Sequence, residues 1–196
     1  MPDSAMYYYN PKTLVHTTTA ARTIEVGEEI TIPCTFLRPL AHTALTATDI
    51  NIMQPHTERQ NMLSQYWGFE CSCSLCSAAS HITRASDARL QKILHLQTVL
   101  ADWSPWSAVT PAMAEELIAL YEEEGIHAAK AAGHTLAALS YNAVGDTRVA
   151  GFHAEFALEA GMVNKGSDDD SKAMKLLLED PVAHWSYRAR ARRDEL

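Results

Sequence analysis

The sequence predicts an α+β fold, with strands in its first part, a cysteine-rich segment after them, and helices in its second half. Three observations predict this fold. Strand-forming residues alternate with turn residues over positions 5–32, three of the four cysteines lie within positions 71–76, and apolar residues recur every three or four positions after residue 85. The chain has 196 residues, which is long enough for one domain or one and a half. Its hydrophobic content of 47% is sufficient for a core.

The first 32 residues predict a hairpin followed by a turn and a short strand. Three tyrosines at positions 7–9 predict the first strand, Asn10-Pro11-Lys12 a turn, and the Thr-rich run 14–20 the second strand. Val26-Gly27-Glu28-Glu29 then predicts a turn, and residues 30–32 a short buried strand.

Cys71, Cys73 and Cys76 have the spacing Cys-x-Cys-x-x-Cys. Thiolates this close in sequence can converge on one metal ion, and a small tetrahedral thiolate site suits Zn²⁺. Clustered cysteines also favour a metal in a reducing compartment over disulfides. A fourth ligand is needed from elsewhere; His81 is a candidate, and Cys34 is the remaining cysteine.

The cysteines follow three aromatic residues, Tyr66, Trp67 and Phe69, and the segment GEEIT occurs upstream at positions 27–31. In combination, these motifs resemble the end of a SET domain and the post-SET cysteine cluster of protein-lysine methyltransferases, over about the first 80 residues. The resemblance implies a partial SET domain over 1–68 and a post-SET-like cysteine segment over 69–80. It also implies zinc at the three cysteines, and S-adenosylmethionine bound near residues 30–32 with the three aromatic residues covering its adenine.

The sequence departs from the family pattern in ways that bear on catalysis. The family's Gly-x-Gly donor loop and its Asn-His segment, which hold S-adenosylmethionine, have no counterpart here. The family follows GEEIT with a catalytic tyrosine, where this chain has Pro33 and Cys34. A cysteine is too short to orient the lysine amine and the donor methyl as that tyrosine does. Impaired or lost methyl transfer is therefore expected, and binding of S-adenosylmethionine is in doubt.

Residues 34–49 form an atypical insertion relative to the family. Removing the bases from inside the Cys34 codon through the first base of the Asp49 codon would leave a tyrosine codon, joined to Ile50. A translated intron and a genuine surface insertion both remain open. The segment Glu58-Arg59-Gln60 after the insertion resembles a helix start in the family; these three residues are expected on the solvated surface, with Thr57 as the helix cap.

Residues 85–196 are expected to be helical. Predicted helices cover about 85–100, 110–125, 128–144, 147–160 and 174–178, with Ser86 or Asp87, Thr110 and Asp146 as caps and Gly161 as a stop. The acidic run 166–171 predicts a helix N-terminus. Alanines in the third and fourth helices allow close approach, and this pair resembles a tetratricopeptide-like hairpin that needs neighbouring helices. The Tyr141-Asn142 and Asp180-Pro181 motifs make this half similar to the helical region of fungal-type SET proteins.

Composition excludes several functions. The net charge is −8 and no block of five basic residues occurs, which argues against direct nucleic-acid binding. No run of 18 apolar residues or signal peptide occurs, so an intracellular protein, cytoplasmic or nuclear, is expected. The terminal Arg-Asp-Glu-Leu, which resembles an ER-retention address, is expected to be coincidental. Patterns for a metalloprotease helix, a P-loop and an EF-hand are missing from the sequence.

Three hypotheses for function remain. The first is a protein-lysine methyltransferase, acting on a protein substrate by positioning and desolvating a lysine amine. The second is a non-catalytic adaptor that binds a protein partner through its helical half. The third is a SET fold reused for a reaction without the methyl donor. Binding of S-adenosylmethionine separates the first hypothesis from the second.

Overall fold

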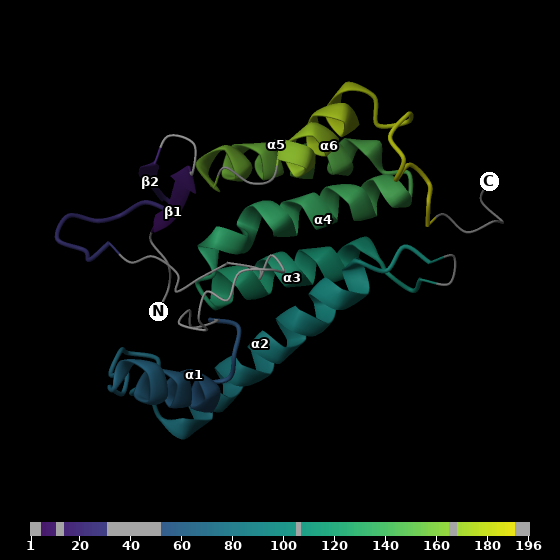
Figure 1. Cartoon of the computed structure of the whole chain (residues 1–196). Coiled ribbons are helices and arrows are strands. Elements are labelled where there is room, and N and C mark those ends of the chain that lie inside the picture. Colours follow the sequence, from purple (N-terminus) through teal and green to yellow (C-terminus); the bar gives the residue numbers. More distant parts are fainter. Residues whose placement is uncertain (1–4, 11–13, 31–51, 105–106, 165–167, 191–196) are drawn as a thin grey trace.

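The computed structural model describes residues 5–10, 14–30, 52–104, 107–164 and 168–190, and helices dominate this part of the chain. Figure 1 shows α2 to α6 lying one beside the next, with the strands next to α5 and with α1 at the start of α2. In order, the elements are β1 (Ala5–Asn10), β2 (Val15–Ala20), α1 (His56–Met62), the π-helix η1 (Leu63–Trp67), α2 (Ser80–Leu100), α3 (Pro111–Glu123), the 3₁₀-helix η2 (His127–Ala129), α4 (Lys130–Ala143), α5 (Thr147–Asn164) and α6 (Asp168–Glu179).

The predicted hairpin is confirmed. β1 and β2 pair antiparallel, from Ala5 opposite Ala20 to Asn10 opposite Val15. The predicted turn at 26–29 is also present, with Gly27 at φ 84°. The expected strand at 30–32 is not seen at Ile30, which is 64% exposed and lies in no strand, while residues 31 and 32 fall outside the described chain. A strand needs a paired neighbour, and the described strands pair only with each other, so this part holds one hairpin and is not β-rich.

The main core lies between α2, α3 and α4. The apolar spacing of α2 buries Leu90, Ile93, Leu96 and Leu100 on one face, as predicted from the sequence. α4 comes close to α3 at Gly133, where an added Cβ would lie 3.1 Å from the Ile118 side chain. The other buried members are Met53, Val109, Ala114, Leu117, Leu120, Tyr121, Ile126, Ala129 and Ala137.

A second core joins α4, α5 and α6. Its buried members are Ala138, Ala150, Ala154, Ala157, Met174 and Leu177. The predicted close packing of the alanine-rich pair is confirmed, because small side chains let α4 and α5 approach and make the most extensive contact between helices. The likeness of this pair to tetratricopeptide repeats stays a prediction.

Several predicted helix ends need correction. Gly161 is buried inside α5, which continues to Asn164, and α6 begins at Asp168 rather than near 174. Packing against neighbouring helices outweighs the modest helix-breaking tendency of one glycine. The acidic start of α6, the Thr110–Pro111 start of α3 and the Gly145–Asp146 turn agree with the prediction.

The caps predicted for α1 and α2 are wrong. α2 begins at Ser80, so Ser86 and Asp87 lie inside it. The Ser86 hydroxyl donates to Glu124, the residue that follows α3 (2.6 Å), and Asp87 accepts a hydrogen bond from the backbone N–H of His56 (2.7 Å). Asp87 thus caps α1 from another helix, which local sequence does not reveal, and Thr57 makes no cap.

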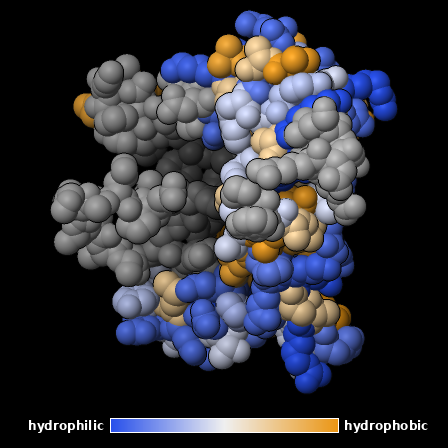
Figure 2. All heavy atoms as spheres, turned by 90° about the vertical axis from the view of Figure 1, so that its right-hand side faces the viewer, coloured by the Kyte–Doolittle hydropathy of each residue, from blue (hydrophilic) through white to orange (hydrophobic). Residues whose placement is uncertain are grey.

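The segment after α6 folds back onto the helices. The buried Asn142 side chain donates to Pro181 O and to Ser186 Oγ, and the Arg190 guanidinium lies 3.7 Å from the centre of the Trp103 ring. On the face drawn in Figure 2, hydrophilic residues make up most of the described surface, with hydrophobic residues in separate groups between them. None of the described helices combines the length and the apolar character needed to cross a bilayer.

Candidate metal centre

The three clustered cysteines lie on the cysteine loop, residues 69–79, which connects η1 to α2. The chain enters this loop through Gly68, which has a positive φ of 70° and donates its N–H to Ser64 O (3.1 Å). A left-handed residue of this kind ends a helix and turns the chain away from its axis, and glycine adopts it without a steric cost. The loop therefore leaves η1 in a fixed direction.

Gln60 on α1 holds the first cysteine in place. Its side-chain Nε2 donates to Cys71 O (2.9 Å), and its Oε1 accepts from Cys71 N (2.8 Å). These two hydrogen bonds satisfy both backbone groups of Cys71, as a neighbouring strand would. One side chain thereby joins α1 to the cysteine loop.

A tight turn brings Cys73 and Cys76 together. The backbone N–H of Ser77 donates to Cys73 O (2.9 Å), and the Ser77 hydroxyl donates to Ser72 O (2.9 Å). Ala78 N also donates to Leu75 O (3.2 Å). One closed turn at these positions places the side chains of residues three apart on the same side.

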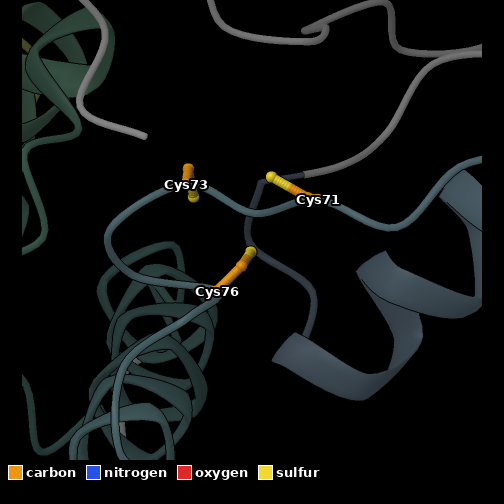
Figure 3. A group of neighbouring side chains, drawn as sticks. All are labelled: Cys71, Cys73 and Cys76. Carbon is orange, nitrogen blue, oxygen red and sulfur yellow. The ribbon is translucent and has the colours of Figure 1, made fainter.

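The three sulfur atoms converge. They all lie within 4.8 Å of one another, and Figure 3 shows them turned toward the space between the three residues. In a tetrahedral site, thiolates about 2.3 Å from zinc lie about 3.8 Å from one another. The donor set and the convergence of the three sulfur atoms thus fit a zinc ion. All three cysteines are half-buried, which leaves the centre accessible to an ion.

The thiols influence each other's ionisation. Burial raises the pKa of both Cys73 and Cys76. At Cys73, hydrogen bonds from the Cys76 backbone N–H and from the other two thiols outweigh burial and lower the pKa to about 7. At Cys76, burial and the neighbouring Cys73 and Cys71 raise the pKa to about 12. Without a cation, Cys73 therefore loses its proton before Cys76 does, whereas a bound divalent ion deprotonates its thiol ligands.

The fourth ligand position has no occupant among the described residues. Within the described ranges, Cys71, Cys73 and Cys76 are the whole of the group, so His81, exposed in the first turn of α2, is not brought to it. Cys34 lies outside the described residues. A site with three protein ligands leaves a position for water or for a ligand from another segment.

The three predicted cofactor-binding residues lie beside the cysteine loop. Tyr66 and Trp67 lie on η1 and Phe69 opens the loop; their exposed fractions are 50%, 56% and 51%. The structure therefore presents large aromatic surfaces next to the cysteines, and their role toward a methyl donor stays a prediction. π-helical turns such as η1 are rare and occur frequently at functional sites.

Three residues of α1 were expected on the solvated surface, but two of them instead form hydrogen bonds to the backbone of neighbouring segments. Glu58 is exposed as predicted, but Arg59 is 9% exposed and donates to the carbonyls of Ile52 and Gln54. Gln60 holds Cys71. The sequence gives no local signal for either role, because each depends on a partner brought close by a turn of the chain.

Comparison of the sequence with those of known proteins shows what the chain is similar to. Over 94 residues the chain is 33% identical to histone-lysine N-methyltransferase set5 of Schizosaccharomyces pombe. The match covers 47% of this chain and 25% of that protein, so the chain spans about a quarter of the length of the curated relative it matches. No family model matches the sequence, and no solved structure matches it. The match supports a relationship to SET-domain proteins.

Proposed function

We propose that this chain is a zinc-binding, SET-related polypeptide of the protein-lysine methyltransferase class in which methyl transfer is impaired. The observation that carries the proposal is the convergence of Cys71, Cys73 and Cys76, because the same three cysteines define the post-SET resemblance. The identity to a histone-lysine methyltransferase supports the class.

Zinc in this centre would have a structural role. The cysteine loop has no buried residue of its own, so a bound ion would replace the hydrophobic core that so short a segment lacks. Cys71, Cys73 and Cys76 would supply three thiolate ligands. The ordered loop would in turn hold Phe69 next to the two aromatic residues of η1, as one apolar surface.

The aromatic surface is the proposed contact for S-adenosylmethionine. Tyr66, Trp67 and Phe69 are half exposed and could cover an adenine ring. Cys34 stands where the family has its catalytic tyrosine, so the hydroxyl that orients the lysine amine is missing from this position. Weak or absent donor binding and impaired transfer are therefore the expected behaviour.

Metal analysis and calorimetry on the purified full chain test the two parts separately. We expect the wild-type protein to contain one equivalent of zinc, Cys73→Ser and Cys76→Ser to lose it, and Ser74→Ala, an exposed residue of the same loop, to retain it. Wild-type protein that is free of zinc, although it was expressed in zinc-supplemented medium, would contradict the metal site.

Titration of S-adenosylmethionine into the zinc-loaded protein tests the donor pocket. We expect no binding with a dissociation constant in the micromolar range. Micromolar binding that is lost in Trp67→Ala, followed by transfer to a lysine peptide, would instead establish an active methyltransferase and overturn the proposed impairment.

A further inference from the structure

The exposed side of α5 carries a regular mixture of phenylalanine and glutamate. The exposed residues of this helix between positions 147 and 161 follow the repeat of three to four residues of an α-helix, which places them on one face. We call this set the α5 stripe; it consists of Arg148, Phe152, Glu155, Phe156 and Glu159. Phe152 is 54% exposed and Phe156 is 42% exposed, although both lie in a well-packed helix.

The two phenyl rings are held in fixed positions by a pair of histidines. Their centroids are 4.8 Å apart with the planes at 59°, so the two rings form an open V. The Phe156 ring stacks on His134 (5.2 Å, 19°), and the Phe152 ring meets His153 edge-on (5.4 Å, 85°). The rings are thus oriented before any ligand arrives.

A hydrogen-bonded chain beneath the rings holds the histidines. Nε2 of His153, which is 4% exposed, lies 3.0 Å from Glu115 Oε1, and its Nδ1 lies 3.0 Å from Nδ1 of His134. The Tyr141 hydroxyl donates to the same Glu115 oxygen (3.1 Å). Because a carboxylate only accepts, His153 donates from Nε2 to Glu115, and a second hydrogen bond joins the Nδ1 atoms of His153 and His134. This network immobilises both histidines, and a surface fixed in advance loses little conformational entropy when it binds a ligand.

The charge of the α5 stripe determines the sign of the charge that a ligand should carry. No ion pair among the described residues involves Glu155 or Glu159, so within this part of the chain their carboxylates flank Phe156 without a basic partner. The chain as a whole carries a net charge of −8. Aromatic faces attract cations through their quadrupole, and carboxylates beside them add to that attraction.

We propose that the α5 stripe binds a basic segment of a partner protein, with a lysine or arginine side chain against the rings of Phe152 and Phe156 and next to Glu155 and Glu159. An apolar segment would leave both carboxylates without a partner at the interface, and a nucleic acid would be repelled by them. The inference does not depend on the zinc site or on methyl transfer.

The test uses the full chain and a short fluorescent lysine-rich peptide, with fluorescence anisotropy as the measurement. We expect saturable binding that weakens as NaCl rises, because exposed charges are screened. The same peptide with norleucine in place of lysine keeps the carbon chain and loses the charge; we expect it to bind at least about tenfold more weakly. Equal affinity for the two peptides, or no binding of the lysine peptide, overturns the proposal.

Variants locate the binding on the protein. Phe152→Leu with Phe156→Leu keeps exposed apolar volume and removes the π faces, so the lysine peptide should bind about three- to tenfold more weakly. Glu155→Gln with Glu159→Gln should weaken binding and flatten its salt dependence. Leu176→Ser, at a 59% exposed residue of α6, is the matched control and should bind as the wild type does. Wild-type affinity in the double Phe variant, with unchanged circular dichroism, also overturns the proposal.

Zinc content and S-adenosylmethionine titration on the same variants keep this proposal separate from the proposed function. Both results should be identical to the wild type in the α5 variants. Conversely, Cys73→Ser should leave the affinity for the lysine peptide unchanged. A loss of peptide binding in Cys73→Ser alone would place the binding surface at the cysteine loop and overturn its assignment to α5.

Discussion

In the helical half, Leu100, Leu117 and Leu177 are fully buried, whereas the stretch from 61 to 82, which includes η1 and the cysteine loop, contains no buried residue. The helices bury apolar side chains against one another, and this burial is the main favourable term in folding. The cysteine loop instead relies on hydrogen bonds to Gln60, on one tight turn and on the proposed metal. Because different interactions hold the two regions, we expect them to lose stability independently.

The largest effect is expected from a cavity in the helical core. Leu117→Ala removes a fully buried side chain between α2, α3 and α4 and should lower the free energy of unfolding by about 2–5 kcal/mol. Chemical denaturation followed by circular dichroism measures the change. Leu176→Ala, at a 59% exposed residue, should stay within about 0.5 kcal/mol of the wild type. Equal losses in the two variants would show that the helices are not held by this core.

A smaller loss of stability is expected from a substitution in the segment after α6, which folds back onto the helices. Arg190 donates to Leu100 O (3.1 Å) and Asp102 O (2.6 Å) and lies over the Trp103 ring. Arg190→Ala should cost about 1–3 kcal/mol of unfolding free energy, because charged hydrogen bonds and a cation–π contact are lost together. Arg190→Lys should recover only part of this, since lysine lacks the planar fork. Arg84→Ala, at an exposed residue, is the control, and full recovery by lysine would contradict the role of the fork.

Removal of the metal should show most clearly that the stability of the cysteine loop is independent of that of the helices. After chelation of the zinc-loaded protein, amide hydrogen exchange in residues 71–78 should speed up by at least about tenfold, because a structural zinc supplies the stability of such a loop. Exchange in α3, α4 and α5 should not change, and the thermal midpoint of the helical signal should move by less than about 2 °C. A parallel loss of protection in the helices would show that the loop and the core are one cooperative unit.

The smallest effect is a pH dependence confined to the helical half. The pKa of His134 is lowered by burial first and then by the neighbouring His153 of α5; Glu115 and Glu122 of α3 oppose the shift, and Lys130 of α4 adds to it. Burial also lowers the pKa of His184.

Because both histidines take up protons more readily in the unfolded chain, their contribution to stability is complete above about pH 6.5 and is lost as pH falls through the lower folded-state values. Denaturation midpoints measured at several pH values between about 7.5 and 5 should therefore fall with pH. The fall should be shallower in His134→Gln with His184→Gln, and unaltered in His95→Gln, at an exposed residue. A slope that persists in the double variant would assign the dependence to other groups.

The sequence predicted those features that depend on neighbouring residues. The hairpin, the order of the helices, the Thr110–Pro111 start and the Gly145–Asp146 turn all have local signals, and they are present. The Cys-x-Cys-x-x-Cys spacing predicted a group of converging thiols, which the structure contains.

Features that depend on distant partners were missed. Asp87 was expected to begin its own helix, but it caps α1, 31 residues earlier in the chain. Gln60 was expected on the surface, but it holds Cys71, which only the turn at Gly68 brings within reach. The histidine pair beneath the α5 stripe joins residues of α4 and α5. No local pattern predicts such pairs, because a glutamine or a histidine in an amphipathic helix could equally well face the solvent.

The contact between Arg190 and the end of α2 has a consequence for the time course of folding in the cell. Arg190 reaches the carbonyls of Leu100 and Asp102 across 90 and 88 residues. A ribosome adds about 5–20 residues per second, so Leu100 is complete roughly 5 to 18 s before its partner exists. During that interval the end of α2 and the Trp103 ring lack their final cover, and a chaperone that recognises exposed aromatic residues would have time to bind there.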